Sequence, residues 1–173
     1  SLTVGALPKV GKMNLAYFAD ERGRVLTEMS LMRYDLEEFI LITAASAQWH
    51  DYEFLKGNLP THEKLSLTDI SNEVSTLIVT GPESRLLLQN LTSADLEKPW
   101  LSVQKTKIGT YSVGLARVSF AGELGWEIHT ENRNITPIYK RIIDFGAKPF
   151  GMFALNSLRI EKGYKTWKGD LST

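Results

Sequence analysis

Arg117-Val-Ser-Phe-Ala-Gly-Glu-Leu-Gly-Trp-Glu-Ile128 is the stretch of this 173-residue sequence that decides how the rest is interpreted. It places two carboxylates, Glu123 and Glu127, around a glycine-bounded turn between two predicted strands. Because side chains alternate along a strand, Glu127 should point away from Trp126 and Ile128, toward either solvent or a polar pocket. A solvent-facing glutamate on a half-exposed sheet is the commoner arrangement, so the pattern alone makes Glu127 a candidate and no more.

The sequence on either side of this stretch predicts further strands and two helices. Strands are expected from about Lys105, over Val113–Phe120 and over Trp126–His129. Isoleucines at helical spacing from Ile135 to Ile143 predict an amphipathic helix, with Thr136-Pro137 as its cap and first residue. A last helix is expected at about Met152–Lys162, ending at Gly163.

The first half of the chain is richer in strand patterns than in helix patterns. Strands are predicted over Lys12–Phe18, Arg24–Arg33, Phe39–Thr43, Leu65–Ile70 and Val74–Val79, and helices over Ala45–Lys56 and Gly81–Leu91. Gly23, in the short loop after the first strand, is expected at positive φ in a hairpin. The fold class that follows is α+β, a single domain over residues 1–173 with mostly antiparallel sheets and flanking helices.

The composition excludes several classes of function. Lys plus Arg (20) equals Asp plus Glu (20), so no net field gathers nucleic acid or an anionic membrane. The chain has no cysteine, and its three histidines, His50, His62 and His129, show no metal-ligand spacing. The longest apolar run, Phe39–Ala45, is far too short to span a bilayer. We therefore expect no metal, no nucleic acid and no membrane partner.

Two further segments carry charged candidates. In the strand that begins at Arg24, alternation puts Glu28 on the same face as Leu26 and Ser30, where an exposed carboxylate is the ordinary case. In the last helix, Arg159 and Glu161 more often form local ion pairs than bind a ligand.

Taken together, these segments resemble one family. The stretch Arg117–Ile128 is similar to the motif R-x-x-Y-x-G-E-x-G-x-E of the tetrahydrofolate-binding aminomethyltransferases, the glycine-cleavage T-protein family. Ala154–Asp170 resembles the C-terminal folate domains of dimethylglycine and sarcosine dehydrogenases, and Val10–Asn14, Gly23–Met29 and Phe39–Thr43 resemble the same branch in the same order. Nearly the whole chain is covered.

The resemblance implies a fold that is part of a three-part disc around a central folate channel. Full-length domains of this family run well beyond the length of this chain. The resemblance therefore implies an aminomethyltransferase-like folate-binding domain that is partial, truncated at both ends.

The resemblance also implies roles for five residues. Glu28 stands where the family has a catalytic aspartate near the folate nitrogens, and Glu127 matches the glutamate that bonds the donor edge of the pterin. Phe120 replaces a tyrosine beside the ligand. Ala44 replaces an asparagine of the pterin pocket, and Leu155 replaces an arginine that meets the folate carboxylate. Two polar contacts of the family are thus missing.

The function implied is folate-dependent one-carbon transfer, in which tetrahydrofolate accepts a methylene unit from the oxidation of an N-methylglycine or from an aminomethyl donor. The oxidation would need FAD in a separate flavoprotein domain or subunit. Two alternatives stay open: a non-catalytic binding or regulatory module on the same scaffold, and a related demethylase for another methylated metabolite. The compartment implied is the cytoplasm for a bacterial protein and the mitochondrial matrix for a eukaryotic one.

Overall fold

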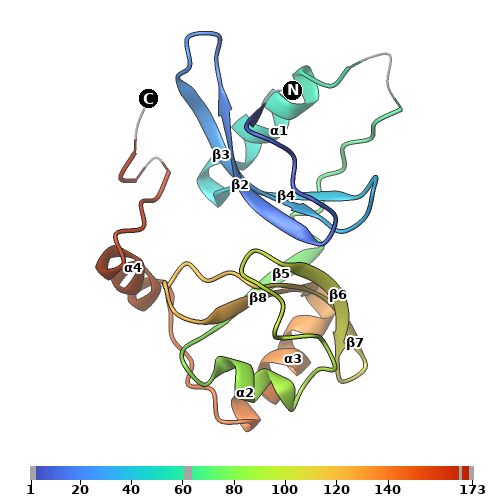
Figure 1. The fold of residues 1–173 in the computed structure, drawn as a ribbon, viewed down its shortest axis with the longest axis vertical. Helices are drawn as coiled ribbons and strands as arrows, with labels where there is room; N and C mark the ends of the chain where they lie inside the picture. Colours follow the sequence, from blue (N-terminus) through green and yellow to red (C-terminus); the bar gives the residue numbers. More distant parts are fainter. Residues whose placement is uncertain (1–2, 61–63, 168, 172–173) are drawn as a thin grey trace.

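The computed structural model describes residues 3–60, 64–167 and 169–171, and these form two four-stranded sheets (Figure 1). The N-terminal sheet has the order β1-β2-β3-β4, with β1 (Thr3–Val4), β2 (Lys12–Ala19), β3 (Val25–Arg33) and β4 (Phe39–Ile42). The C-terminal sheet has the order β5-β8-β7-β6, with β5 (Val74–Thr80), β6 (Val103–Ile108), β7 (Tyr111–Ala116) and β8 (Gly125–Glu131). Neighbouring strands within both sheets are antiparallel, which confirms the predicted fold class.

Helices cover the outer faces of the two sheets, except for the last helix, which stands to one side. They are η1 (Ala45–Ala47), α1 (Gln48–Gly57), α2 (Ser84–Gln89), α3 (Asn132–Asp144) and α4 (Met152–Glu161). Phe54 and Leu55 of α1 pack against Met29 and neighbouring core residues of the N-terminal sheet. Ile138 and Ile142 of α3 lie in the core of the C-terminal sheet. In Figure 1, α1 lies beside the upper sheet, α2 and α3 lie below, and α4 stands to one side.

The two sheets also pack against each other, through the faces that the helices leave free. Met13 and Met32 from the N-terminal sheet form a buried cluster with Val103 and Ala116 from the C-terminal sheet. Backbone hydrogen bonds join the sheets at one corner, where the Met13 amide donates to the Leu101 carbonyl at 2.9 Å. The space between the sheets is therefore narrow and apolar at this corner, and any site between them must lie beside it.

Strand β3 divides its side chains between these two environments. Met29 and Leu31 face α1, whereas Met32 faces the C-terminal sheet. Because alternate residues share a face, Glu28 and Ser30 lie on the same side as Met32. The hairpin that leads into β3 turns at Gly23, whose φ of 77° confirms the expected positive value.

The sequence-based elements differ from the structure most clearly at three places. Residues 65–70 form no strand, because no neighbouring strand pairs with them and Leu65 is exposed. The strand predicted over Val113–Phe120 ends at Ala116, because the Val118 amide donates to the Ala116 carbonyl at 3.0 Å and turns the chain out of the ladder. Helix α3 begins at Asn132, four positions before the predicted Thr136 cap.

Tertiary contacts explain the early start of α3. The Asn132 side chain accepts a hydrogen bond from Ser75 Oγ at 2.5 Å and donates to the Asn72 carbonyl at 2.7 Å. These bonds fix the chain as it leaves β8, and Pro137 is then accommodated within the helix. A local pattern that reads proline as a first helical residue cannot register such contacts.

Candidate functional site

Glu127 lies in β8 on the face of the C-terminal sheet that meets the N-terminal sheet. Its neighbours Trp126 and Ile128 are fully buried on the opposite face, and the Glu127 side chain is 21% exposed. Its cross-strand partner on β7 is Ala116, which packs against Met32 of β3. The predicted orientation is therefore confirmed, and the carboxylate lies at the edge of the space between the sheets rather than on the outer surface.

His129 shares this face of β8 two residues further along. Its ring is 8% exposed, and its Nδ1 lies 2.9 Å from Oγ1 of Thr76 on β5. Its Nε2 lies 3.4 Å from Oε2 of Glu127, an ion-pair distance, and has no hydrogen-bond partner within the described residues. The sequence analysis found no metal-ligand spacing for His129 and assigned it no role. Its spacing of two residues from Glu127 along a strand is the signal that pairs the two side chains.

Tyr34, just after β3, crosses from the N-terminal sheet toward this pair. A Cβ atom at Gly114, the β7 residue opposite His129, would lie 2.5 Å from the Tyr34 hydroxyl, so the tyrosine uses space that only glycine leaves free. Burial, followed by the charges of Glu38 and Glu127, raises the pKa of Tyr34 to about 12. The phenol therefore stays protonated and close enough to Glu127 to sense its charge.

Glu28 lies on the facing surface of the N-terminal sheet. It is paired across the ladder with Tyr17 of β2. The pKa of Tyr17 is raised by burial and then by a hydrogen bond to Glu28 and its charge. Leu15, on the same face of β2, is 50% exposed, so the C-terminal sheet does not cover this end of the face. Glu28 thus lies beside open space on the surface that faces Glu127.

Ala44 continues the same surface beyond β4. Ile42 is paired with Ser30 of β3, and the extended backbone at Ala44 (φ −63°, ψ 135°) carries the alternation two residues further. Ala44 itself lies beyond the paired part of β4, whose ladder ends at Ile42, and is the N-cap of η1. The small apolar side chain offers no polar contact to a ligand there.

Phe120 lies in the turn between β7 and β8 and contacts the segment after α4. Its ring stacks on Tyr164, with ring centroids 6.2 Å apart and an interplanar angle of 18°. Glu123 in the same turn is half exposed and lies 3.7 Å from Nζ of Lys162. The second carboxylate of the decisive stretch is therefore a surface ion-pair partner and not a companion of Glu127.

Leu155 lies apart from the other predicted site residues. It is 6% exposed, on α4, and lines an apolar groove of about 800 Å³ bounded by β5, α2 and α3. The groove is not lined by Glu28, Ala44, Phe120 or Glu127, but it includes Ile78, the β5 partner of Glu127. The structure thus places Glu28 on the face of the N-terminal sheet that meets the C-terminal sheet, and Glu127 on the facing surface. Ala44 lies just beyond the end of β4, and Leu155 lies in a neighbouring groove.

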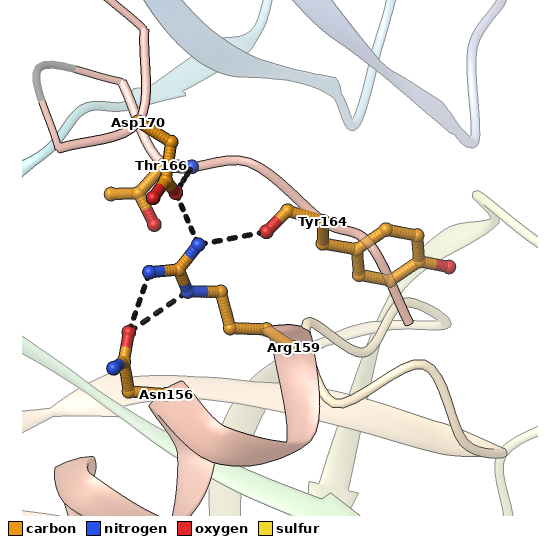
Figure 2. A network of polar contacts seen from close by, with 5 residues as sticks. All are labelled: Asn156, Arg159, Tyr164, Thr166 and Asp170. Atoms are coloured by element: carbon orange, nitrogen blue, oxygen red, sulfur yellow. Dashed lines mark hydrogen bonds and ion pairs between the residues drawn. The ribbon is translucent and has the colours of Figure 1, made fainter. Parts of the chain in front are cut away.

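Arg159 forms a structural network that holds the end of the described chain (Figure 2). Its guanidinium donates to Asn156 Oδ1 at 2.7 and 2.9 Å, to the Tyr164 carbonyl at 2.9 Å, and to the Asp170 carboxylate. The Thr166 amide, more than Arg159, holds the pKa of Asp170 below its usual range. Arg159 pairs with Asp170 and not with Glu161, and through Tyr164 the network supports the ring stacked on Phe120.

The described residues include no cluster of three or more side chains suited to holding a metal ion. His50 bonds the buried Asp51 through Nδ1 at 2.8 Å, and His129 is committed to Thr76, whereas His62 lies outside the described residues. No helix in the described part of the chain is long and apolar enough to cross a membrane.

Comparison with known proteins confirms the resemblance seen in the sequence. The family model described as GCVT N-terminal domain matches residues 2–173. Mitochondrial dimethylglycine dehydrogenase of Rattus norvegicus is 32% identical, over 99% of this chain and 21% of the relative. Aminomethyltransferase of Thermoanaerobacter pseudethanolicus is 30% identical, over 90% of this chain and 44% of the relative. The chain thus spans about a fifth of the first relative's length and less than half of the second's.

Two solved structures share the fold. Aminomethyltransferase T of the glycine cleavage system from Bartonella henselae matches with a TM-score of 0.77 at 23% identity, over 91% of this chain and 42% of that one. Heterotetrameric sarcosine oxidase from Corynebacterium sp. U-96 matches with a TM-score of 0.61 at 22% identity, over 86% of this chain and 72% of that one. The antiparallel α+β architecture is therefore that of an aminomethyltransferase T.

Proposed function

We propose, because this chain belongs to the family of GCVT N-terminal domains, that it is a folate-dependent one-carbon transfer domain. In this role tetrahydrofolate accepts a methylene unit derived from an N-methylglycine such as dimethylglycine or sarcosine, or from an aminomethyl donor. The observation that carries the proposal is the placement of Glu127 at the edge of the inter-sheet space, largely shielded, facing the surface that bears Glu28.

Glu127 suits the donor edge of a pterin. A pterin presents a ring N–H beside an exocyclic amine, and one carboxylate can accept from both in a bidentate arrangement. A glutamine could accept at its oxygen only, because its amide nitrogen is a donor. Partial burial strengthens such charge-assisted bonds by excluding water.

Glu28 suits a role at the nitrogens that bridge pterin and aminobenzoate. When such an amine captures an electrophilic iminium or methylene unit, its nitrogen lone pair forms the new C–N bond, and its proton must leave to a base. The carboxylate of Glu28 would orient the amine and accept that proton. Its hydrogen bond with Tyr17 would hold the carboxylate in place while the reaction proceeds.

The remaining parts of the proposal concern the longer protein. Residues 1–173 would form part of one folate-binding domain, and the electrophile would come from a flavin-dependent oxidation carried out by a separate domain or subunit. The compartment would follow the source, cytoplasmic for a bacterial protein and the mitochondrial matrix for a eukaryotic one.

Calorimetry with tetrahydrofolate on the full-length gene product tests the proposal. Glu127→Ala should weaken binding by at least about tenfold, because two charge-assisted hydrogen bonds are lost. Glu131→Ala is the matched control, since Glu131 lies in the same strand and pairs with the exposed Arg133. Indistinguishable affinities for wild type and Glu127→Ala would refute the assignment.

A second candidate is a non-catalytic module that keeps the scaffold for binding or regulation. Specific observations favour it: Phe120 is engaged by Tyr164, Leu155 lines an apolar groove, and Ala44 offers no polar group. A flavin-binding sequence upstream in the same reading frame would support the enzyme, and its absence from the full-length gene would support the module. Ala44→Asn should strengthen folate binding only if the pocket is used.

A further inference from the structure

His129 is the most conspicuous unused polar group of the inter-sheet space. Only 8% of His129 is exposed, yet its Nε2 has no hydrogen-bond partner within the described residues. A buried polar atom without a partner costs stability, so a reason for its presence is expected. The nearest charged group is the Glu127 carboxylate, whose Oε2 lies 3.4 Å away.

We infer that His129 is a positioning residue for Glu127. In this arrangement the Thr76 hydroxyl donates to Nδ1 across 2.9 Å, and Nε2 carries a proton that attracts Oε2 of Glu127 across 3.4 Å, a contact of charges outside hydrogen-bond geometry. The inference rests on the proposed function, because it assigns His129 the task of orienting the carboxylate that would receive the pterin.

The tautomer follows from the two neighbours of the ring. If Nδ1 carried the proton, the Nε2 lone pair would face a carboxylate oxygen and the two would repel each other. If Thr76 donates to Nδ1, Nε2 carries the proton and the contact with Glu127 is attractive. The hydrogen bond at one ring nitrogen thus sets what the other nitrogen can do.

The surroundings restrict the ring to this orientation. Thr76 on β5 and Glu127 on β8 contact its two nitrogens, and Gly114 on β7 lies opposite its backbone. Tyr34, the titratable group that arrives from the N-terminal sheet, occupies the space above Gly114. A ring confined on these sides can hold the carboxylate of Glu127 in one rotamer, which lowers the entropy lost when a ligand binds.

Two substitutions separate positioning from simple packing. The amide nitrogen of His129→Gln can reach the place of Nε2 and donate to Glu127. His129→Asn is shorter and can reach only the place of Nδ1, beside Thr76. Positioning therefore requires that His129→Gln keep tetrahydrofolate affinity within about threefold, whereas His129→Asn lowers it by about tenfold. A purely structural role would make the two variants alike.

The test combines nitrogen-15 NMR of labelled histidine in the full-length protein with calorimetry using tetrahydrofolate. The expected result is an Nε2–H tautomer for His129, disturbed by Thr76→Val but not by Thr80→Val, a control on the same strand that bonds Ser119 instead. An Nδ1–H tautomer, or His129→Asn binding as tightly as wild type, would overturn the inference. A wild-type protein that shows the Nε2–H tautomer but binds no tetrahydrofolate would refute the proposed function while supporting the His129–Glu127 pair.

Discussion

The ionisation of Tyr34 offers a direct test of how the two sheets are placed. The side chain comes from the N-terminal sheet, yet its pKa of about 12 depends partly on Glu127 of the C-terminal sheet. Burial contributes most, because it penalises the phenolate, and the charges of Glu38 and then Glu127 add to it. Replacing any of these contributors should lower the pKa of Tyr34.

The size of the effect follows from a shift of about two units above the ordinary tyrosine value of about 10. At pH 11 about a tenth of Tyr34 would be ionised in the folded protein, against about nine-tenths in the unfolded chain. Because the folded pKa is raised, this contribution to stability is complete below pH 10 and is lost as pH rises toward 12. Between pH 9 and pH 11 the linked loss is about 1.3 kcal/mol.

Urea denaturation at pH 9 and pH 11 measures this loss as the difference between wild type and Tyr34→Phe. NMR of carbon-13-labelled tyrosine measures the pKa itself. Glu127→Gln should lower the pKa of Tyr34, and Glu38→Gln alone should lower it by more, because Glu38 contributes more than Glu127. An unchanged pKa in Glu127→Gln would refute the placement of Tyr34 beside Glu127, and with it the facing arrangement of the sheets.

Three other predictions address the same architecture. Gly114→Ala should destabilise the protein by about 1–3 kcal/mol in urea denaturation, because the new Cβ would meet the Tyr34 hydroxyl. The loss of stability should be smaller in a Tyr34→Phe background, and an equal loss would contradict the contact. Asp170→Asn should abolish the acid sensitivity of the contacts that Asp170 makes with Arg159 and the Thr166 amide. Because the pKa of Asp170 is lowered in the folded protein, these contacts stabilise it above about pH 4 and are lost as the pH falls further. Hydrogen exchange at the Thr166 amide measures this, and equal acid sensitivity in both proteins would contradict it. Glu28→Gln in the full-length enzyme should lower the transfer rate by at least about a hundredfold and change tetrahydrofolate affinity by less than about threefold, and a loss confined to affinity would contradict a proton-transfer role.

The sequence predicts those features of the site that depend on local alternation. The orientation of Glu127 between Trp126 and Ile128 follows from the period of a strand, and so does the shared face of Glu28 and Ser30. Each statement needs only a few neighbouring residues, which is why the structure agrees with it.

The features that the sequence misses depend on contacts between distant segments. Tyr34 approaches His129 only because the two sheets pack together and Gly114 leaves room. The alternating residues at 65–70 satisfy a strand pattern, but no partner strand pairs with them. Likewise, Asn132 starts α3 because residues near the beginning of β5 bond its side chain. Local propensity carries no information about such partners.

A crystal structure of the full-length protein with tetrahydrofolate is the most direct test of the folate-binding role. We expect the pterin between the two sheets, with its ring N–H and exocyclic amine each about 2.7–2.9 Å from an oxygen of Glu127. Its reactive nitrogens should then lie toward Glu28. A pterin seated elsewhere, for example in the groove lined by Leu155, with Glu127 contacting no ligand, would contradict the proposed site.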